Sequence, residues 1–429
     1  MENFESRLQL KSQILPLLIA LLLILQLIAP YRGWRILLVG LGGAWLLGYL
    51  WARSLMRGLR LTREMRMGWV RVGDRLVERF TLANEGWASA LWVELVDHST
   101  LPDYRASRGA SVSDVRLIRW HRQAVCTRRG LFTLGPTTLQ TGDPFGLYTV
   151  TLHYPASLPF LVLPPVVPLP TIEVAPGGST GEGLPRANAL ERTVSASTVR
   201  EYLPGDSLRW VHWPTSARRN SFFVRLFDST PASDWWILLD VNRFVQVGQG
   251  QDATDEHGVI LAASLADRAL RLGRSVGLAA QGERLVWLPP RGGEGQRWEI
   301  LRALALVSRG SCPLAELLTR AGPALGRHAS LVVVTPAVDG AWIEPLVPLL
   351  RRGAIPTVLL LDPVSFGGDG SLGEAQASLA GLGVACHVIT RDLLDQADAG
   401  SPGQETWERS GTGERLFQKR RPDEWRGLS

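Results

Sequence analysis

Cysteine is scarce in this sequence of 429 residues. The three cysteines, Cys126, Cys312 and Cys386, lie far apart and form no C-x-x-C pair. This excludes a redox C-x-x-C motif and predicts a reducing compartment, in which all three are small apolar packing residues. Cys386 and His387 are adjacent, but neighbouring residues of a strand point to opposite faces, so we do not interpret them as a nucleophile and its base.

Lysine is nearly absent as well, because only Lys11 and Lys419 contribute to the 46 basic residues. The formal net charge of +6 is therefore an arginine charge, which we interpret as coding composition. No basic run alternates with stacking aromatic residues as a single-strand groove requires, so nucleic acid is not expected as a partner. The length predicts two or three globular domains.

A phosphate-binding loop is also missing. The stretch 171–198 contains Gly177-Gly178 and Gly181-Glu182-Gly183, but it lacks the Gly-Lys-Ser/Thr ending and the flanking strand and helix of such a loop. Its glycine, proline and small polar residues predict a flexible linker.

Two long apolar runs are present near the N-terminus. Ile14 to Ala29 and Ile36 to Ala52 carry no charge, and Pro30 to Gly33 form a tight connection between them. Each run is about the minimum length that spans a bilayer core, so residues 1–66 are predicted to form a transmembrane helical hairpin with a basic flank and the lipid bilayer as a partner. A cleavable signal peptide is disfavoured because the second run would remain as an anchor.

The arginines around this hairpin are unevenly distributed. Two lie in the connection, and five follow the second run: Arg32 and Arg35 against Arg53, Arg57, Arg60, Arg63 and Arg66. The positive-inside rule then predicts a protein of the cytoplasmic membrane with both termini and its soluble domains in the cytoplasm.

Short alternating runs separated by turn residues follow from 67 to 170. Their period of two and regular spacing predict a small antiparallel β-sandwich. No catalytic grouping appears in this part of the sequence.

The segment 199–230 has an unusual density of specific polar and aromatic groups. Pro204 and Gly205 suit the centre of a type II turn, and the Asp206 carboxylate can cap the turn or accept a bidentate arginine. The run from Phe222 to Phe227 alternates and predicts a strand. The segment is interpreted either as an arginine-stapled joint between domains or as a partner-binding surface.

The order of residues in this segment resembles the signature of a bacterial family known as domain of unknown function 58. Ten positions carry the resemblance: Arg200, Tyr202, Pro204, Gly205, Asp206, Arg209, Trp213, Ser216, Ala217 and Arg218. Two further stretches, Arg128-Arg129-Gly130 and Asp143-Pro144-Phe145-Gly146-Leu147, are similar to segments common in that family. The resemblance implies a von Willebrand factor A-like domain after the signature and a MoxR-type AAA+ ATPase as partner.

From 231 to 394 the pattern becomes α/β. Apolar strands alternate with helices, and one hairpin at Gly282-Glu283 interrupts the series. We therefore predict an α/β, von Willebrand factor A-like (Rossmann-like) domain, followed by a polar tail over 395–429. Ligands of such a sheet are expected at the carboxyl ends of its strands.

A metal site at that edge would be degenerate. Asp240 stands in the first position of the D-x-S-x-S loop that intact domains of this type use, and Asn242 replaces the first serine. Phe244 occupies the second serine position, and Pro336 follows Thr335 at the position where the pattern of such domains has an acidic residue. With so few oxygen donors left, no cofactor and no functional Mg²⁺ site are expected.

Two functions remain open from the sequence. The first is a membrane-anchored, non-catalytic scaffold or adaptor that works with the ATPase in assembly, chaperone-like or envelope and stress functions. The second is a membrane-associated hydrolase or metal-dependent ligand-binding protein that uses His212 or the Asp240 loop. His212 near Asp206 is the acid–histidine pair of the motif, but no positioned nucleophile is evident.

Overall fold

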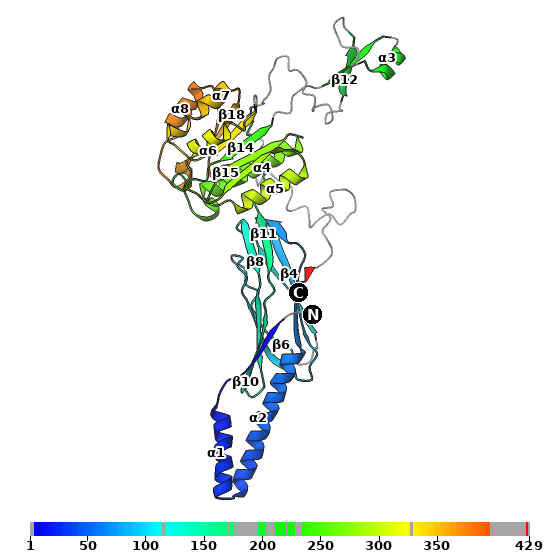
Figure 1. The fold of residues 1–429 in the computed structure, drawn as a ribbon, viewed down its shortest axis with the longest axis vertical. Coiled ribbons are helices and arrows are strands. Elements are labelled where there is room, and N and C mark those ends of the chain that lie inside the picture. Colours follow the sequence, from blue (N-terminus) through cyan, green and yellow to red (C-terminus); the bar gives the residue numbers. More distant parts are fainter. Residues whose placement is uncertain are drawn as a thin grey trace. The chain divides into compact units, whose positions relative to one another are not determined.

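The computed structural model describes residues 4–112, 117–169, 171–175, 196–202, 211–219, 221–227, 234–326, 329–394 and 426–427 (Figure 1). The chain divides into two compact units. One unit comprises Met1–Pro165, Leu301–Leu306 and Pro402–Ser429, and the other comprises Val166–Ile300 and Val307–Ser401.

The first unit begins with two helices that pack side by side, α1 (Ile14–Ile28) and α2 (Arg32–Gly58) (Figure 1). Most of the leucine and isoleucine side chains of α1 are exposed. In the part of the chain that the structure describes, α2 is the one helix long and apolar enough to cross a membrane, whereas α1 has 15 residues. The helical hairpin is therefore present, and its two membrane spans stay a prediction.

The C-terminal part of α2 packs against the β-strands of the same unit. Gly48, Ala52 and Leu55 are buried, and the Trp51 indole donates a hydrogen bond to the Ser89 carbonyl over 3.1 Å. The helix continues without a loop into strand β2 (Leu59–Met65). The second apolar run is therefore partly a core segment of the β-structure.

The predicted domain boundary at residue 66 is wrong for this reason. Strand β2 and the N-terminal strand β1 (Glu5–Leu10) both belong to the β-sheets, since β2 pairs with β4 and β1 pairs with β10. Alternate residues of β2 are buried, Arg63 among them, and Arg60 and Arg63 gave the segment the appearance of a basic flank.

Three sheets enclose one hydrophobic core in this unit. Their strand orders are β1-β10-β9-β5-β6, β20-β2-β4-β7 and β3-β11-β8. The remaining strands are β3 (Trp69–Arg71), β4 (Arg75–Asn84), β5 (Ala90–Asp97), β6 (Arg108–Val112), β7 (Leu117–Val125), β8 (Gly130–Leu134), β9 (Thr137–Gly142), β10 (Tyr148–Tyr154), β11 (Leu158–Leu163) and β20 (Arg426–Gly427). The pairs are antiparallel except β3 with β11, and β20, from the predicted polar tail, pairs with the end of β2.

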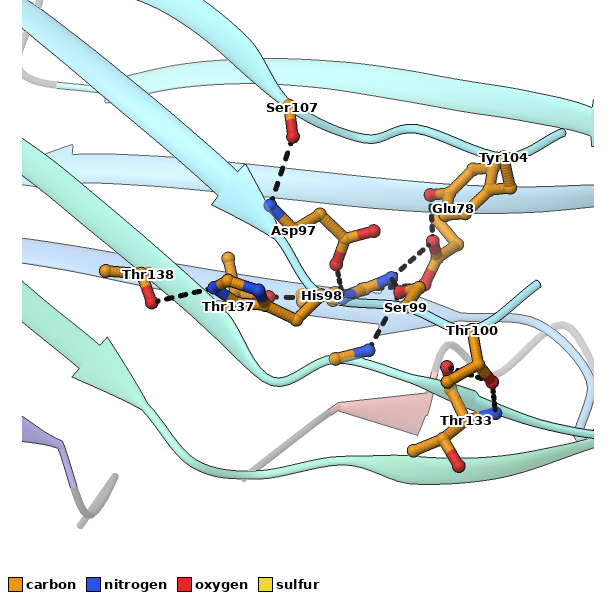
Figure 2. Close-up of polar contacts among 12 residues, drawn as sticks. Glu78, Asp97, His98, Ser99, Thr100, Tyr104, Ser107, Thr133, Thr137 and Thr138 are labelled. Atoms are coloured by element: carbon orange, nitrogen blue, oxygen red, sulfur yellow. Dashed lines mark hydrogen bonds and ion pairs between the residues drawn. The ribbon is translucent and has the colours of Figure 1, made fainter. Parts of the chain in front are cut away.

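A buried ionic cluster joins two of these sheets. The guanidinium of Arg63 on β2 donates to both carboxylate oxygens of Glu78 over 2.8 and 2.9 Å and to Asp97 over 2.6 Å. The hydroxyls of Thr137 and Ser99 accept its two other N–H groups, so all five donors are used. Glu78 also accepts from the Tyr104 hydroxyl (Figure 2). Arg63, predicted as part of the basic flank, is therefore a core residue.

The second unit contains a six-stranded sheet of order β16-β15-β14-β17-β18-β19. Its strands are β14 (Trp235–Leu239), β15 (Val276–Gln281), β16 (Leu285–Arg291), β17 (Ser330–Thr335), β18 (Ile355–Leu361) and β19 (Ala385–Ile389). All neighbours are parallel except the edge hairpin β15–β16. In chain order this arrangement reads 3-2-1-4-5-6, the doubly wound order. The predicted α/β fold with one hairpin is confirmed.

Helices cover both faces of that sheet. Helix α4 (Thr254–Arg271) lies against one face, where Gly258 approaches Leu239, and α6 (Leu314–Ala321), α7 (Leu346–Arg351) and α8 (Gly373–Gly381) share a core with the other face. Helix α5 (Glu294–Leu306) follows the hairpin.

The described beginning of the predicted linker is part of this second unit. The Ala175 amide donates to the Thr357 hydroxyl over 3.0 Å, and its carbonyl accepts from the Ser330 hydroxyl over 3.0 Å. Ile172 is buried. The linker prediction over 171–198 is therefore wrong for 171–175, and 176–195 lie outside the described residues.

Candidate functional site

The signature segment folds as a small module of its own. Strands β12 (Ala196–Glu201) and β13 (Phe223–Phe227) form an antiparallel pair, and helix α3 (Trp213–Arg219) lies between them in sequence (Figure 1). Pro214 falls in the first turn of α3, where its missing N–H has no helical partner to lose. We call these three elements and the described residues next to them, 196–202, 211–219 and 221–227, the signature module.

Ser216 holds the helix to the strand. Its hydroxyl donates to the His212 carbonyl over 3.0 Å and accepts from the Phe223 amide over 2.9 Å. The side chain is buried, and the His212 amide donates to the Phe223 carbonyl over 2.7 Å. The signature serine is therefore an architectural residue.

His212 begins the helix. Its Nδ1 accepts from the Thr215 amide over 3.2 Å and lies 2.7 Å from the Thr215 hydroxyl. Because an amide can only donate, Nδ1 carries no proton in this arrangement. Asp206, the predicted acid partner, lies outside the described residues.

Three aromatic rings of the module form a row in which the middle ring, that of Phe222, contacts the other two. Trp213 is 65% exposed and Phe222 is 51% exposed, and their ring centroids lie 6.3 Å apart in an edge-on arrangement. The Tyr202 ring lies 6.2 Å from Phe222, also edge-on. We call Tyr202, Phe222 and Trp213 the aromatic strip; the exposed Ala217 and Arg218 follow Trp213 on α3.

The structure thus brings together six of the ten signature residues. Tyr202, Trp213, Ser216, Ala217 and Arg218 belong to the module, and the backbone of Arg200 pairs with Val224. Pro204, Gly205, Asp206 and Arg209 lie outside the described residues. Sequence reasoning missed Phe222, whose only signal was an aromatic residue at the start of the predicted strand.

The second candidate region is the carboxyl edge of the α/β sheet. Asp240 follows β14 and is buried; its Oδ1 accepts from the Asn242 amide over 3.0 Å and its Oδ2 from the Thr335 hydroxyl over 2.7 Å. Burial, which outweighs these hydrogen bonds, raises the pKa of Asp240 to about 6.

The neighbours of Asp240 are also engaged. Asn242 Oδ1 accepts from the Phe244 amide over 3.3 Å, and the exposed Phe244 ring has the Arg243 guanidinium 5.1 Å from its centroid. Gln246 donates to the Asp240 carbonyl over 2.9 Å. Across the described residues, no three His, Cys, Asp or Glu side chains are grouped to hold a metal ion.

The fold therefore defines a class of protein. Its members have an α/β domain of doubly wound order that follows the signature module in the chain. Residues 198–366 match the sequence profile of the family described as "Protein of unknown function DUF58". The match over this segment confirms the resemblance seen in the sequence.

The curated relatives are uncharacterised proteins. An uncharacterized protein of Bacillus subtilis, YeaD, is 32% identical over 163 residues, which cover 37% of each chain. An uncharacterized protein of Mycobacterium tuberculosis, Rv1480, is 25% identical over 172 residues, 38% of this chain and 54% of its own. The chain therefore spans about a third to a half of the length of these relatives.

Two solved structures show weaker likeness. An aerotolerance-related membrane protein of Bacteroides fragilis aligns with 39% of this chain and 100% of its own, with 17% identity and a TM-score of 0.26. The SpRpn10 VWA domain aligns with 40% of this chain and 95% of its own, with 15% identity and a TM-score of 0.28.

Proposed function

We propose that this chain is a membrane-anchored, non-catalytic adaptor whose signature module binds a protein partner through the aromatic strip. The observation that carries the proposal is the exposure of Trp213 and Phe222, which contact each other, and of Arg218 on the same helix as Trp213. Exposed tryptophan, tyrosine and arginine are the residue types that dominate binding energy at protein interfaces. The family resemblance makes a MoxR-type AAA+ ATPase the partner that we expect.

The chemistry of the two candidate sites supports an adaptor better than a hydrolase. A general base needs a nitrogen free to accept a substrate proton, but Nδ1 of His212 already accepts from the Thr215 amide, and the hydroxyl beside it, that of Thr215, belongs to the same helical turn. A divalent cation needs oxygen donors turned toward it, whereas both Asp240 oxygens accept hydrogen bonds, one from the Asn242 amide and one from the Thr335 hydroxyl. The residues present do not fit a metal ion, and we derive no step through one.

The apolar hairpin supports the anchor. Side chains such as Leu21, Leu27 and Val39 are large, apolar and exposed. Exposing this apolar area costs free energy in water but not among lipid tails. We propose that both helices enter the membrane and that the soluble units are cytoplasmic. With Arg63 in the core, the cations at the exit of the hairpin are Lys11, Arg53, Arg57, Arg60 and Arg66, against Arg32 and Arg35 at its tip.

Affinity purification of the tagged full chain from its own membranes, with ATP held unhydrolysed, tests the adaptor. We expect an AAA+ ATPase to co-purify and to be reduced by an order of magnitude in Trp213→Ala and Arg218→Ala, since one interface anchor contributes ~1–2 kcal/mol or more. Leu272→Ala is the matched control, because Leu272 is 68% exposed but lies outside the signature module. Equal recovery from all variants would contradict the proposed surface.

A further inference from the structure

The end of the β-sheet unit that surrounds α2 exposes several large apolar side chains. Trp87 follows strand β4, Leu91 and Trp92 lie at the start of β5, and Phe145 lies in the turn before β10; all four are exposed. We call Trp87, Leu91, Trp92 and Phe145 the apolar collar.

Contacts with α2 place this collar beside the helix where it leaves the core. The Trp87 ring meets the Trp51 ring edge-on, with centroids 5.4 Å apart. The turn that carries Phe145 approaches Gly48, where an added Cβ would lie 3.2 Å from Asp143 Oδ2. Trp92 packs over Gly142, at the start of the same turn.

The turn is built so that Phe145 points outward. The Asp143 carboxylate accepts from the Phe145 amide over 2.9 Å and from the Tyr148 amide over 2.5 Å, which fixes the backbone on both sides of the ring. Leu147 packs against the core, whereas Phe145 is 56% exposed. Phe145 is therefore an outward-facing side chain of this turn.

The lengths of the two helices indicate where the collar lies relative to the membrane. Since α2 packs against the β-unit from Gly48 onward, its free apolar part is 32–47, and α1 has 15 residues. At 1.5 Å per residue, each helix extends about 23 Å from the collar, less than the ~30 Å of a hydrocarbon core. A hairpin this short can bridge the core only if the β-unit sits directly on the membrane.

We propose that the apolar collar inserts into the lipid interface of the leaflet that the hairpin enters. Tryptophan and phenylalanine are favoured at headgroup depth, and a collar there would shorten the distance that the hairpin must cover. Lys11 and Arg57, both exposed at the same end of the hairpin, suit anionic headgroups. The inference rests on the proposed membrane anchor and adds that the anchored unit is docked rather than tethered.

Site-specific photo-cross-linking of the full chain tests the collar. A benzophenone amino acid is placed at position 145, at 131 or at 21, and the protein is reconstituted in vesicles of phosphatidylethanolamine and phosphatidylglycerol. Leu131 is 58% exposed and so matches Phe145 in exposure. It comes shortly after the end of β7, which pairs with the start of β4, and the length of β4, about 30 Å, separates that start from the end that precedes Trp87. Leu21 lies in the hairpin and reports the anchor itself.

We expect lipid adducts at 145 and 21, with about tenfold less at 131. Adducts at 21 without adducts at 145 would overturn the collar and leave the anchor standing, whereas no adduct at 21 would overturn both. Cross-links from 145 to a second copy would overturn lipid insertion in favour of self-association. Position 92 serves as a second collar site should the residue at 145 disturb the turn.

Discussion

At the scale of single residues, Asp240 shows how the degenerate loop has changed its chemistry. Its carboxylate is held by Thr335 and by the Asn242 amide in a site with little water, and burial raises its pKa to about 6. The folded state therefore binds a proton more tightly than the unfolded chain does, because the ordinary pKa is 3.8. This stabilisation is complete below the unfolded pKa and is lost as the pH rises to 6 and above.

The Asp240→Asn variant should remove that pH dependence. We expect the wild-type protein to lose up to ~3 kcal/mol relative to the variant as the pH rises from about 4 to above 6. Thermal unfolding in detergent at a series of pH values measures the difference, and other carboxylates cancel in the comparison. A constant difference between wild type and variant would show that Asp240 is ionised throughout.

Ser216 provides a second prediction at this scale. Ser216→Ala removes the acceptor of the Phe223 amide, and a buried unpaired N–H costs ~1–3 kcal/mol. Amide hydrogen exchange should therefore become faster across α3 and β13. Ser221→Ala is the control, since the Ser221 hydroxyl is exposed and bonds only to the Arg219 carbonyl among the described contacts. Similar exchange in both variants would argue against an architectural role for Ser216.

At the scale of elements, the passage from α2 into β2 couples the hairpin to the β-sheets. There is no loop between them, and four residues into β2 the Arg63 side chain joins two sheets through Glu78 and Asp97. The hairpin and the buried ionic cluster are therefore joined by regular structure without an intervening linker.

Arg63→Ala should be strongly destabilising, because it leaves two buried carboxylates without their cation. We expect a loss of ~3–5 kcal/mol in the free energy of unfolding. Arg79→Ala is the matched control, since Arg79 pairs with Glu64 at 2.5 Å on the partly exposed side of the same sheet and should cost less than ~1 kcal/mol. Chemical denaturation of the two variants gives both values, and equal losses would contradict the cluster's importance.

The elements also show what the sequence can predict. The strands of the α/β sheet were recognisable because fully buried strands such as β17 and β18 are continuous apolar runs. Helix α6 was missed, since its eight residues follow Pro313 within a short loop-like stretch. Strand β2 was missed because Arg60 and Arg63 look alike in the sequence, although Arg60 is only half-buried and Arg63 lies on the buried face against Glu78.

At the scale of the whole molecule, sequence reasoning recovered the family resemblance and the α/β fold but not the aromatic strip. The signature residues were recognisable by their order, yet Phe222 depends on a pairing across the module, where the Tyr202 amide bonds to the Phe222 carbonyl over 2.7 Å. The apolar collar was likewise hidden, because its members come from three separate turns and strands. Such surfaces arise from long-range packing that no local pattern encodes.

The central claim is that the aromatic strip contacts a partner directly. A photo-reactive residue at position 222 of the full chain, irradiated in native membranes with ATP held unhydrolysed, should form a cross-link to an AAA+ ATPase identified by mass spectrometry. The same residue at position 131 should not. Cross-links from 222 only to lipid or to the chain itself would contradict the account and remove the adaptor surface.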